Sequence, residues 1–235
     1  REASFLLNNF LLLGIVAVTL WGVLFPLTSE FAQNETVTVS TPYFNRINGP
    51  LLLALIALMG IGPVLPWRRA TMVSVKRWLL WPAAIAVLTF SGLLLASALF
   101  ASGLDNPIAL FAFSVLTFVA AAVAEEWYRG SAARHRSGDS WPTAFWRLLN
   151  GNRPRHGGYI VHLSILMLAF GVVGTQFFDQ RTEVVLDLGQ TTTFDNYTLT
   201  FVDHQTEERR DRLAQWAVVD VTKNGNPVGQ VKPWN

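Results

Sequence analysis

The sequence predicts a polytopic α-helical membrane protein of about five transmembrane helices, followed by a small extracytoplasmic β domain. Three observations predict this fold class. Apolar residues make up 51% of the 235 residues and charged residues only 14%, whereas a soluble domain carries about 25% charged residues. Five long stretches contain no Asp, Glu, Lys or Arg. Beyond Phe178 the pattern changes to alternating, β-branched residues, which is typical of strands.

Each charge-free stretch can cross a hydrocarbon core of roughly 30 Å, which takes about 20 residues. We expect spans at about residues 5–28, 48–67, 78–103, 107–124 and 158–178, and so a transmembrane domain over residues 1–178. Gly60, Gly62, Pro63 and Pro66 lie in the second half of the second span and predict a kinked or unwound segment. No basic segment precedes the first span, so it is not read as a signal peptide. Both chain ends are expected to be cuts in a longer protein.

The charged loops predict the orientation. Two loops carry most of the basic residues, and they alternate with loops that have almost none. The first holds Arg68, Arg69, Lys76 and Arg77, and the second holds Arg129, Arg134, Arg136, Arg147, Arg153 and Arg155. The positive-inside rule places both in the cytoplasm, with the N-terminus inside and the tail outside. Trp67, Trp78, Trp81, Trp127 and Trp141 cluster at the same ends of the spans, as an interfacial aromatic belt would.

The tail, residues 179–235, is expected to be a β-rich domain that is incomplete here. Three segments alternate in polarity and predict strands: Glu183–Leu188, Tyr197–Val202 and Trp216–Thr222. Asn224-Gly225 is a strong signal for a type I′ hairpin turn.

The composition excludes several kinds of chemistry. The chain has no cysteine, so disulfides, thiolate metal sites and cysteine nucleophiles are excluded. The formal charge of +2 is small and its basic residues sit in two short loops, which argues against nucleic-acid binding. No phosphate-binding glycine loop, HExxH or G-x-S-x-G sequence occurs.

Of the four histidines, His162 is the strongest candidate for chemistry. It lies about two turns past Arg155 and therefore inside the apolar part of the fifth span. An ionisable residue in a membrane span is expensive to keep there, and imidazole is a common ligand of metals and haem iron. The alternative is a helix-packing histidine bonded to a neighbouring Ser or Asn. His135 reads as a solvated loop residue, His156 as interfacial and His204 as a surface residue after a strand.

Two further features are weaker candidates. Pro42, Tyr43, Phe44 and Asn45 predict an aromatic turn in the first outer loop, which is either an interfacial anchor or a surface for a flat ligand or partner. Glu125 and Glu126 end the fourth span. Adjacent carboxylates there usually mark a solvated helix end, and a proton relay would need a partner.

The order of these features resembles the second half of the CcmF family of cytochrome c-type biogenesis proteins, the haem lyase component of cytochrome c maturation system I. The resemblance covers essentially the whole chain in order. It is carried by Arg1-Glu-Ala-Ser-Phe-Leu-Leu-Asn-Asn9, Pro42-Tyr-Phe-Asn45, Leu58-Met-Gly-Ile-Gly-Pro63 with Trp67-Arg-Arg69, Gly157-Gly-Tyr-Ile-Val-His-Leu163, and Glu183 to Phe201.

The resemblance implies a bacterial inner-membrane subunit that assists attachment of haem to the CXXCH thiols of apocytochrome c. It implies that a haem b in the membrane is held by two histidines, of which His162 matches one. The second axial ligand and the family's Trp-rich haem-handling motif would lie outside this chain, and the chain alone would be inactive. The implied partners are membrane lipid, a periplasmic haem chaperone, apocytochrome c and a thiol-handling maturation subunit.

Two other classes of function remain open at this point. A transporter of haem or another small amphiphile would suit the Gly/Pro-interrupted second span, because broken helices mark transport sites. A non-catalytic assembly scaffold would predict that His162 can be replaced without loss of function.

Overall fold

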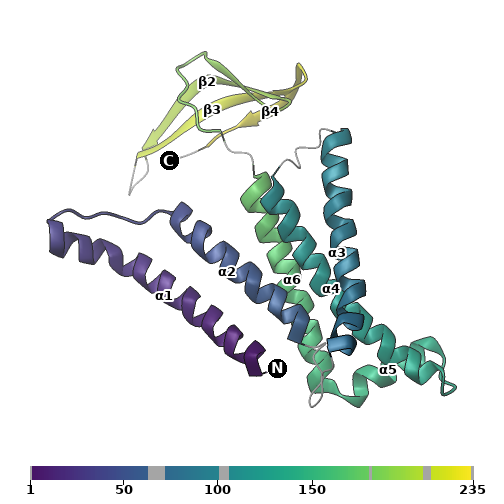
Figure 1. Cartoon of the computed structure of the whole chain (residues 1–235). Coiled ribbons are helices and arrows are strands. Elements are labelled where there is room, and N and C mark those ends of the chain that lie inside the picture. Colours follow the sequence, from purple (N-terminus) through teal and green to yellow (C-terminus); the bar gives the residue numbers. More distant parts are fainter. Residues whose placement is uncertain (1, 63–71, 101–105, 180–181, 209–212, 234–235) are drawn as a thin grey trace. The chain divides into compact units, whose positions relative to one another are not determined.

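The computed structural model describes residues 2–62, 72–100, 106–179, 182–208 and 213–233 (Figure 1). The chain divides into two compact units, Arg1–Asp179 and Gln180–Asn235. In the described residues the first unit is helical and the second is one antiparallel sheet. The predicted fold class is therefore confirmed.

Five of the helices are long and apolar enough to cross a membrane. They are α1 (Glu2–Gln33), α2 (Thr41–Ile61), α3 (Met72–Phe100, with its span from Trp78), α4 (Pro107–His135) and α6 (Arg153–Phe178). The short helix α5 (Trp141–Gly151) lies between α4 and α6 in the sequence. In the described residues the number of such helices agrees with the five predicted spans, and the predicted ends at residues 63–67 and 101–103 lie outside the described residues.

Local sequence signals set where two of these helices begin. The Asn106 side chain accepts hydrogen bonds from the backbone N–H groups of Ile108 and Ala109, and Pro107 follows it in the first turn. At α6 the Asn152 side chain accepts from the backbone N–H of Arg155. Asn is a favoured N-cap because its oxygen satisfies N–H groups that have no partner within the helix, and Pro has no N–H to satisfy there.

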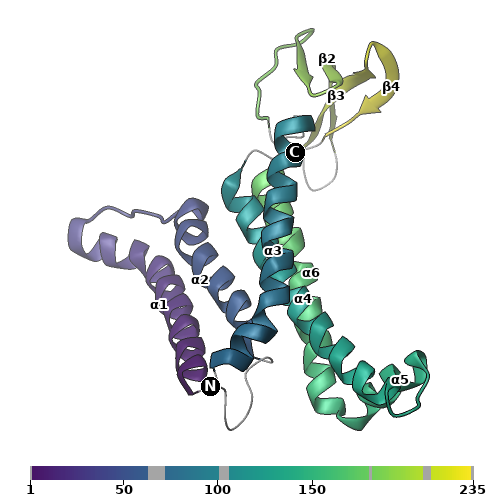
Figure 2. The same ribbon diagram turned by 45° about the vertical axis from the view of Figure 1, so that its right-hand side comes forward.

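The helix α4 is the centre of the helical unit, and it contacts α2, α3, α5 and α6 (Figure 2). Leu116 and Val119 of α4 and Leu166 of α6 form a buried cluster. Gly60 of α2 lies so close to α4 that a Cβ there would be 2.9 Å from Val119 Cγ2. The helix α1 packs on α2.

The structure changes the expectation for the segment 125–155, which the sequence predicts as a basic loop. The helix α4 continues to His135, and α6 begins at Arg153. Between them α5 buries Ala144 and Leu148 and exposes Trp146. Its apolar and polar residues alternate at helical spacing over only three turns, which a search for long apolar spans misses. In the second span α2 is continuous to Ile61, while Pro63 and Pro66 lie outside the described residues.

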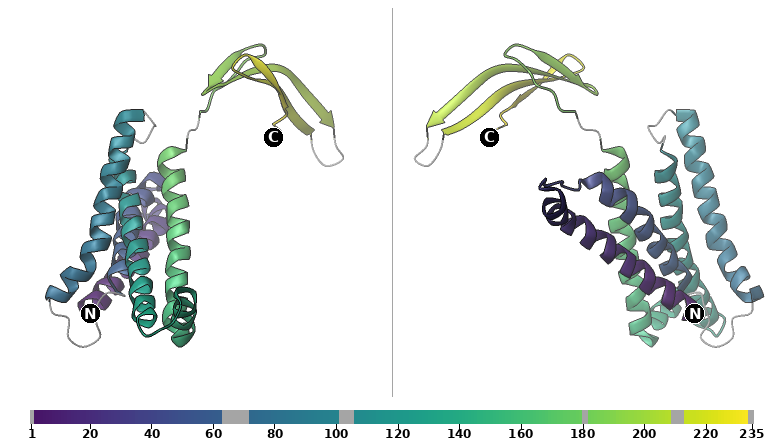
Figure 3. Two further views of the ribbon diagram at one scale, coloured as in Figure 1. Left: turned by 90° about the vertical axis from the view of Figure 1, so that its right-hand side faces the viewer. Right: turned by 60° about the vertical axis from the view of Figure 1, so that its left-hand side comes forward.

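The second unit is a meander in the order β1-β2-β3-β4 (Figure 3). The strands are β1 (Thr191–Phe194), β2 (Tyr197–Glu208), β3 (Leu213–Lys223) and β4 (Asn226–Val231). All three pairings are antiparallel. Lys223 pairs with Asn226, and the two residues between them have φ values of 50° (Asn224) and 82° (Gly225), as a type I′ turn requires. The predicted hairpin is confirmed.

The prediction of a strand over Glu183–Leu188 is wrong. The structure leaves this segment irregular, with Val185 94% exposed. It ends in a turn in which the Gln190 N–H donates to the Asp187 carbonyl. The first strand is instead Thr191–Phe194, which pairs with the start of β2 through a tight turn at Asp195 and Asn196. A strand is stabilised by pairing with a neighbouring strand. Both edges of β2 are already paired, one with β1 and the other with β3, so β2 offers no edge to Glu183–Leu188.

Candidate functional site

His162 lies in the middle third of α6 and is partly exposed. Within the described part of the chain its Nδ1 atom is buried and has no hydrogen-bond partner. The helix-packing alternative needs a bond to a neighbouring Ser or Asn, and the structure shows none to Nδ1 in the described residues. Because Nδ1 is covered by protein atoms and the residue is partly exposed, Nε2 is the candidate nitrogen for a group from outside this chain.

The surface of α6 beside His162 is open at Gly158 and apolar at Ile165. Gly158 lies one turn before His162 on the same face, and a Cβ built there would meet no heavy atom within 4 Å. Ile165, one turn after His162, is exposed. A haem fits this arrangement, because it needs one imidazole nitrogen from the helix and an apolar wall for the porphyrin.

A metal bound only by protein side chains does not fit as well. Within the described residues there is no group of three or more His, Cys, Asp or Glu side chains that could hold a metal ion. The porphyrin nitrogens of a haem supply the equatorial ligands themselves, so a single histidine from this chain suffices for one axial position.

His156 is placed differently from His162, although it lies on the same helix. The sequence suggests an interfacial residue, but its ring is buried, with 5% of the residue exposed. The indole Nε1 of Trp127 on α4 donates to His156 Nδ1 over 3.2 Å. Nδ1 therefore carries no proton, and this histidine joins two helices.

Tyr159 lies between the two histidines. It is buried, and its ring centroid is 5.7 Å from that of His156 and 6.3 Å from that of His162. Its hydroxyl oxygen accepts a hydrogen bond of 3.0 Å from Arg155 Nε. Tyr159 thus packs the His162 ring from the side nearer the start of α6.

The two adjacent glutamates are not a free helix end. Both lie inside α4, since this helix continues to His135. Glu126 accepts a hydrogen bond of 2.5 Å from Arg155, and Glu125 lies 3.9 Å from Arg129. The Glu125 Oε2 atom is buried without a hydrogen-bond partner in the described residues. Glu126 therefore ties α4 to α6, whereas Glu125 pairs with Arg129 along α4 itself.

Pro42, Tyr43, Phe44 and Asn45 do not form a turn in an outer loop. They form the first turn of α2, after Ser40 in extended conformation, because Pro is well accommodated at the first helical positions. The Tyr43 and Phe44 rings lie edge to face, with centroids 5.3 Å apart. A Cβ on Gly22 of α1 would be 2.6 Å from the Phe44 ring, so this glycine admits the ring. Asn45 Nδ2 donates to Gln176 Oε1 of α6 over 2.8 Å.

The remaining histidines are exposed. His135 stacks on Trp141 with ring centroids 4.6 Å apart, and its Nδ1 lies 2.7 Å from the Asp139 carbonyl oxygen. His204 lies inside β2 rather than after a strand, and it pairs with Ala217 of β3.

Sequence reasoning missed Trp127 and Tyr159 as residues of this site. The sequence predicts Trp127 to lie in the interfacial belt, and its partner His156 is 29 residues away. The spacing does contain one signal. Arg155, Tyr159 and His162 follow at intervals of four and three residues and so share one face of α6.

No family model matches the chain. Over 204 residues it is 28% identical to the cytochrome c-type biogenesis protein CycK of Rhizobium meliloti, covering 86% of this chain and 29% of that protein. It is 24% identical over 229 residues to the cytochrome c-type biogenesis protein CcmF of Haemophilus influenzae, covering 97% of this chain and 33% of the relative. For the CcmF protein of Escherichia coli the identity is 26% over 227 residues.

A solved structure described as cytochrome c haem lyase CcmF is also similar. It matches 100% of this chain and 34% of its own chain, with a TM-score of 0.65 and 25% identity. The chain therefore spans about a third of the length of the curated relatives it matches. Sequence and fold agree, and the resemblance inferred from the sequence is confirmed: over its whole length, this chain is similar to about a third of a CcmF-type cytochrome c biogenesis protein.

Proposed function

We propose that this chain is part of a haem-handling membrane subunit of cytochrome c maturation, and that it assists covalent attachment of haem to the CXXCH thiols of apocytochrome c. His162 supplies one axial ligand to a haem b in the membrane, and the second ligand comes from outside this chain. The observation that carries the proposal is the pair of unlike histidines on α6. His156 is satisfied by Trp127, whereas the described structure gives His162 Nδ1 no partner.

The residues around His162 would each have a role toward the haem. His162 would bind the iron through Nε2, Tyr159 would hold the imidazole ring in place, and Gly158 would leave space for the porphyrin edge. The protein would tune the reduction potential of such a haem through the axial ligand and the apolar surround. When bound, haem would supply a redox-active iron that passes one electron at a time toward the incoming haem iron or the thiols and is re-reduced by an electron donor from outside this chain.

The proposal includes the orientation and partners of the subunit. The protein would lie in the bacterial inner membrane, with the N-terminus of this chain in the cytoplasm and the sheet in the periplasm. The Pro42–Asn45 turn and the sheet would each offer surface to a periplasmic haem chaperone, apocytochrome c and a thiol-handling subunit. The exposure of Pro42 and Asn45 supports this role. The Phe44 ring, which packs on α1, would brace the turn and would not contact the partner.

Visible spectra of the full-length protein that carries this chain test the ligand. We expect sharp reduced-haem bands in the wild type and their loss in His162→Ala. His204→Ala is the matched control, because His204 is an exposed imidazole in the sheet. His162→Gly with added free imidazole separates ligation from packing, because a free ligand can restore the bands only where the lost group bound the iron.

Bands that survive His162→Ala would remove this residue from the haem site. Failure of free imidazole to restore them in His162→Gly would favour a packing role. A wild-type protein without haem would favour the transporter or the scaffold, which uptake into vesicles would then separate. The described part of α2 is continuous, so the broken-helix argument for a transporter has no support there.

A further inference from the structure

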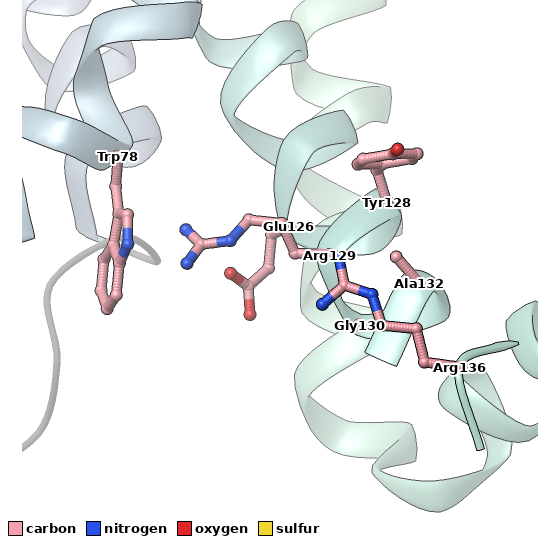
Figure 4. Close-up of a pocket in the computed structure, with 7 residues that line it drawn as sticks. All are labelled: Trp78, Glu126, Tyr128, Arg129, Gly130, Ala132 and Arg136. Carbon is pink, nitrogen blue, oxygen red and sulfur yellow. The ribbon is translucent and has the colours of Figure 1, made fainter. Parts of the chain in front are cut away.

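A second site lies away from His162, at the end of α4 where the charged residues gather. A pocket of about 440 Å³ opens between the start of the α3 span and the last turns of α4. Trp78 lines it from α3, and Glu126, Tyr128, Arg129 and Arg136 line it from the end of α4 (Figure 4). From this pocket we propose that the protein binds the phosphate of an anionic phospholipid headgroup, with Arg129 and Arg136 as the phosphate ligands.

The spacing of the two arginines brings them to one side of α4. They are seven residues apart, which is nearly two full helical turns, so both side chains leave the same face. Figure 4 shows the Arg129 guanidinium extending toward the Trp78 indole. Its Cζ lies 4.6 Å from the centre of that ring, a cation–π contact that holds the group in place.

The charges in the pocket favour an anion. Arg136 is exposed, and its side chain forms no ion pair within the described part of the chain. The carboxylate in the lining, Glu126, already pairs with Arg155 from α6. Arg129 has a long contact of 3.9 Å with Glu125 along α4, so the pair of arginines keeps a net positive charge toward the pocket. Guanidinium groups bind phosphate oxygens through charge-assisted hydrogen bonds, and two of them can hold one phosphodiester from two sides.

The position of the pocket selects a lipid over a soluble phosphate. It sits where the apolar part of α3 begins, with Trp78 at the boundary, as interfacial aromatic residues do. From Trp78 an exposed apolar stripe runs along α3 through Trp81, Ile85 and Leu88. These residues recur at helical spacing, so acyl chains attached to a headgroup in the pocket would lie along them. Basic pockets beside spans on the cytoplasmic side are typical sites for anionic headgroups.

Lipid retention by the purified full-length protein tests the proposal. The protein is purified in mild detergent, mixed with equal amounts of phosphatidylglycerol and phosphatidylcholine, and examined by native mass spectrometry. We expect the wild type to retain phosphatidylglycerol preferentially. The variant Arg129→Gln/Arg136→Gln should bind it about tenfold more weakly, as expected when charge-assisted bonds worth about 1.4 kcal/mol are lost. Arg147→Gln is the matched control, because Arg147 lies on α5 outside the pocket and pairs with Asp139.

Three outcomes would overturn the proposal. The double variant could retain phosphatidylglycerol as well as the wild type does. The wild type could retain both lipids equally. Excess inorganic phosphate could displace the lipid from the wild type, which would make a free phosphate the occupant. If the double variant does not fold, Arg136→Gln alone still decides the matter, because that exposed side chain makes no ion pair in the described structure.

Discussion

The indole Nε1 of Trp127 donates a hydrogen bond of 3.2 Å to Nδ1 of His156, and so ties α4 to α6 six residues before His162. The bond lies beside Tyr159, whose ring centroid is 6.4 Å from that of Trp127. The helix that carries the candidate ligand is therefore anchored by an aromatic contact and a hydrogen bond close to it.

Replacing Trp127 tests this anchor. Trp127→Phe keeps most of the ring but removes the donor, which leaves the Nδ1 atom of a buried histidine unsatisfied. We expect a destabilisation of about 1–3 kcal/mol, seen as a lower midpoint of thermal unfolding in detergent. Trp146→Phe is the control, because Trp146 is 67% exposed on α5. Equal midpoints for the two variants would show that the bond contributes nothing to stability.

The approach of α2 to α4 depends on Gly60. Gly60→Ala would place a methyl group 2.9 Å from Val119 Cγ2 and 3.1 Å from the Val119 Cα, so the two helices must separate. We expect a loss of about 1–3 kcal/mol from overpacking. In Gly92→Ala of α3 the added methyl meets no atom within 4 Å. That control should be neutral or gain up to about 1 kcal/mol from helix propensity. Unfolding in a denaturing detergent series measures both, and a stabilised Gly60→Ala would contradict the packing.

Space beside His162 is needed if a haem binds there. Gly158→Leu fills the open face one turn before His162, and we expect the reduced-haem bands of the full-length protein to fall sharply. Gly171→Leu is made on the same helix, where a Cβ also meets no atom within 4 Å, and should leave the bands unchanged. Normal bands in Gly158→Leu would place the porphyrin on another face of α6.

The hairpin between β3 and β4 depends on Gly225, whose φ is 82°. Gly225→Ala should strain this turn by about 1–2 kcal/mol, because a Cβ is disfavoured in the left-handed region. Hydrogen exchange of the β4 amides in the whole protein should then become faster. Val228→Ala, at an exposed position in β4, serves as the comparison. Unchanged exchange in Gly225→Ala would mean that β4 is held by its ladder alone.

The spans and the hairpin could be predicted because their signals are local. The charge-free apolar stretches that contain Val119 and Leu166 can be recognised without knowing which helices they contact. Asn224-Gly225 likewise specifies its own backbone angles. His162 stood out for the same reason, as an imidazole inside an apolar stretch. The sequence could not show which of its nitrogens is covered, because that depends on how α6 packs on α4.

The features that the sequence did not predict are tertiary contacts and short elements. Trp127 and His156 meet only because α4 and α6 lie side by side. The sequence predicts a loop at Phe44, yet its ring packs on Gly22 in another helix. The strand at Thr191–Phe194 has a polar composition, and it becomes a strand through pairing with Tyr197–Thr200. For the two helix contacts the deciding partner lies outside the window that a periodicity search examines, and for the strand the signal is the pairing and not the periodicity.

The uneven burial of the spans has a consequence for mutational tolerance. In the most apolar window of α4, 44% of the residues are buried within the described structure, against 0% in α3 and 6% in α1. A saturation library should therefore accept exchanges among Leu, Ile, Val and Phe almost freely along α3. Along α4 it should reject these larger side chains at Ala109 and Ala122, and Leu or Phe at Val123, where neighbouring helices leave no room.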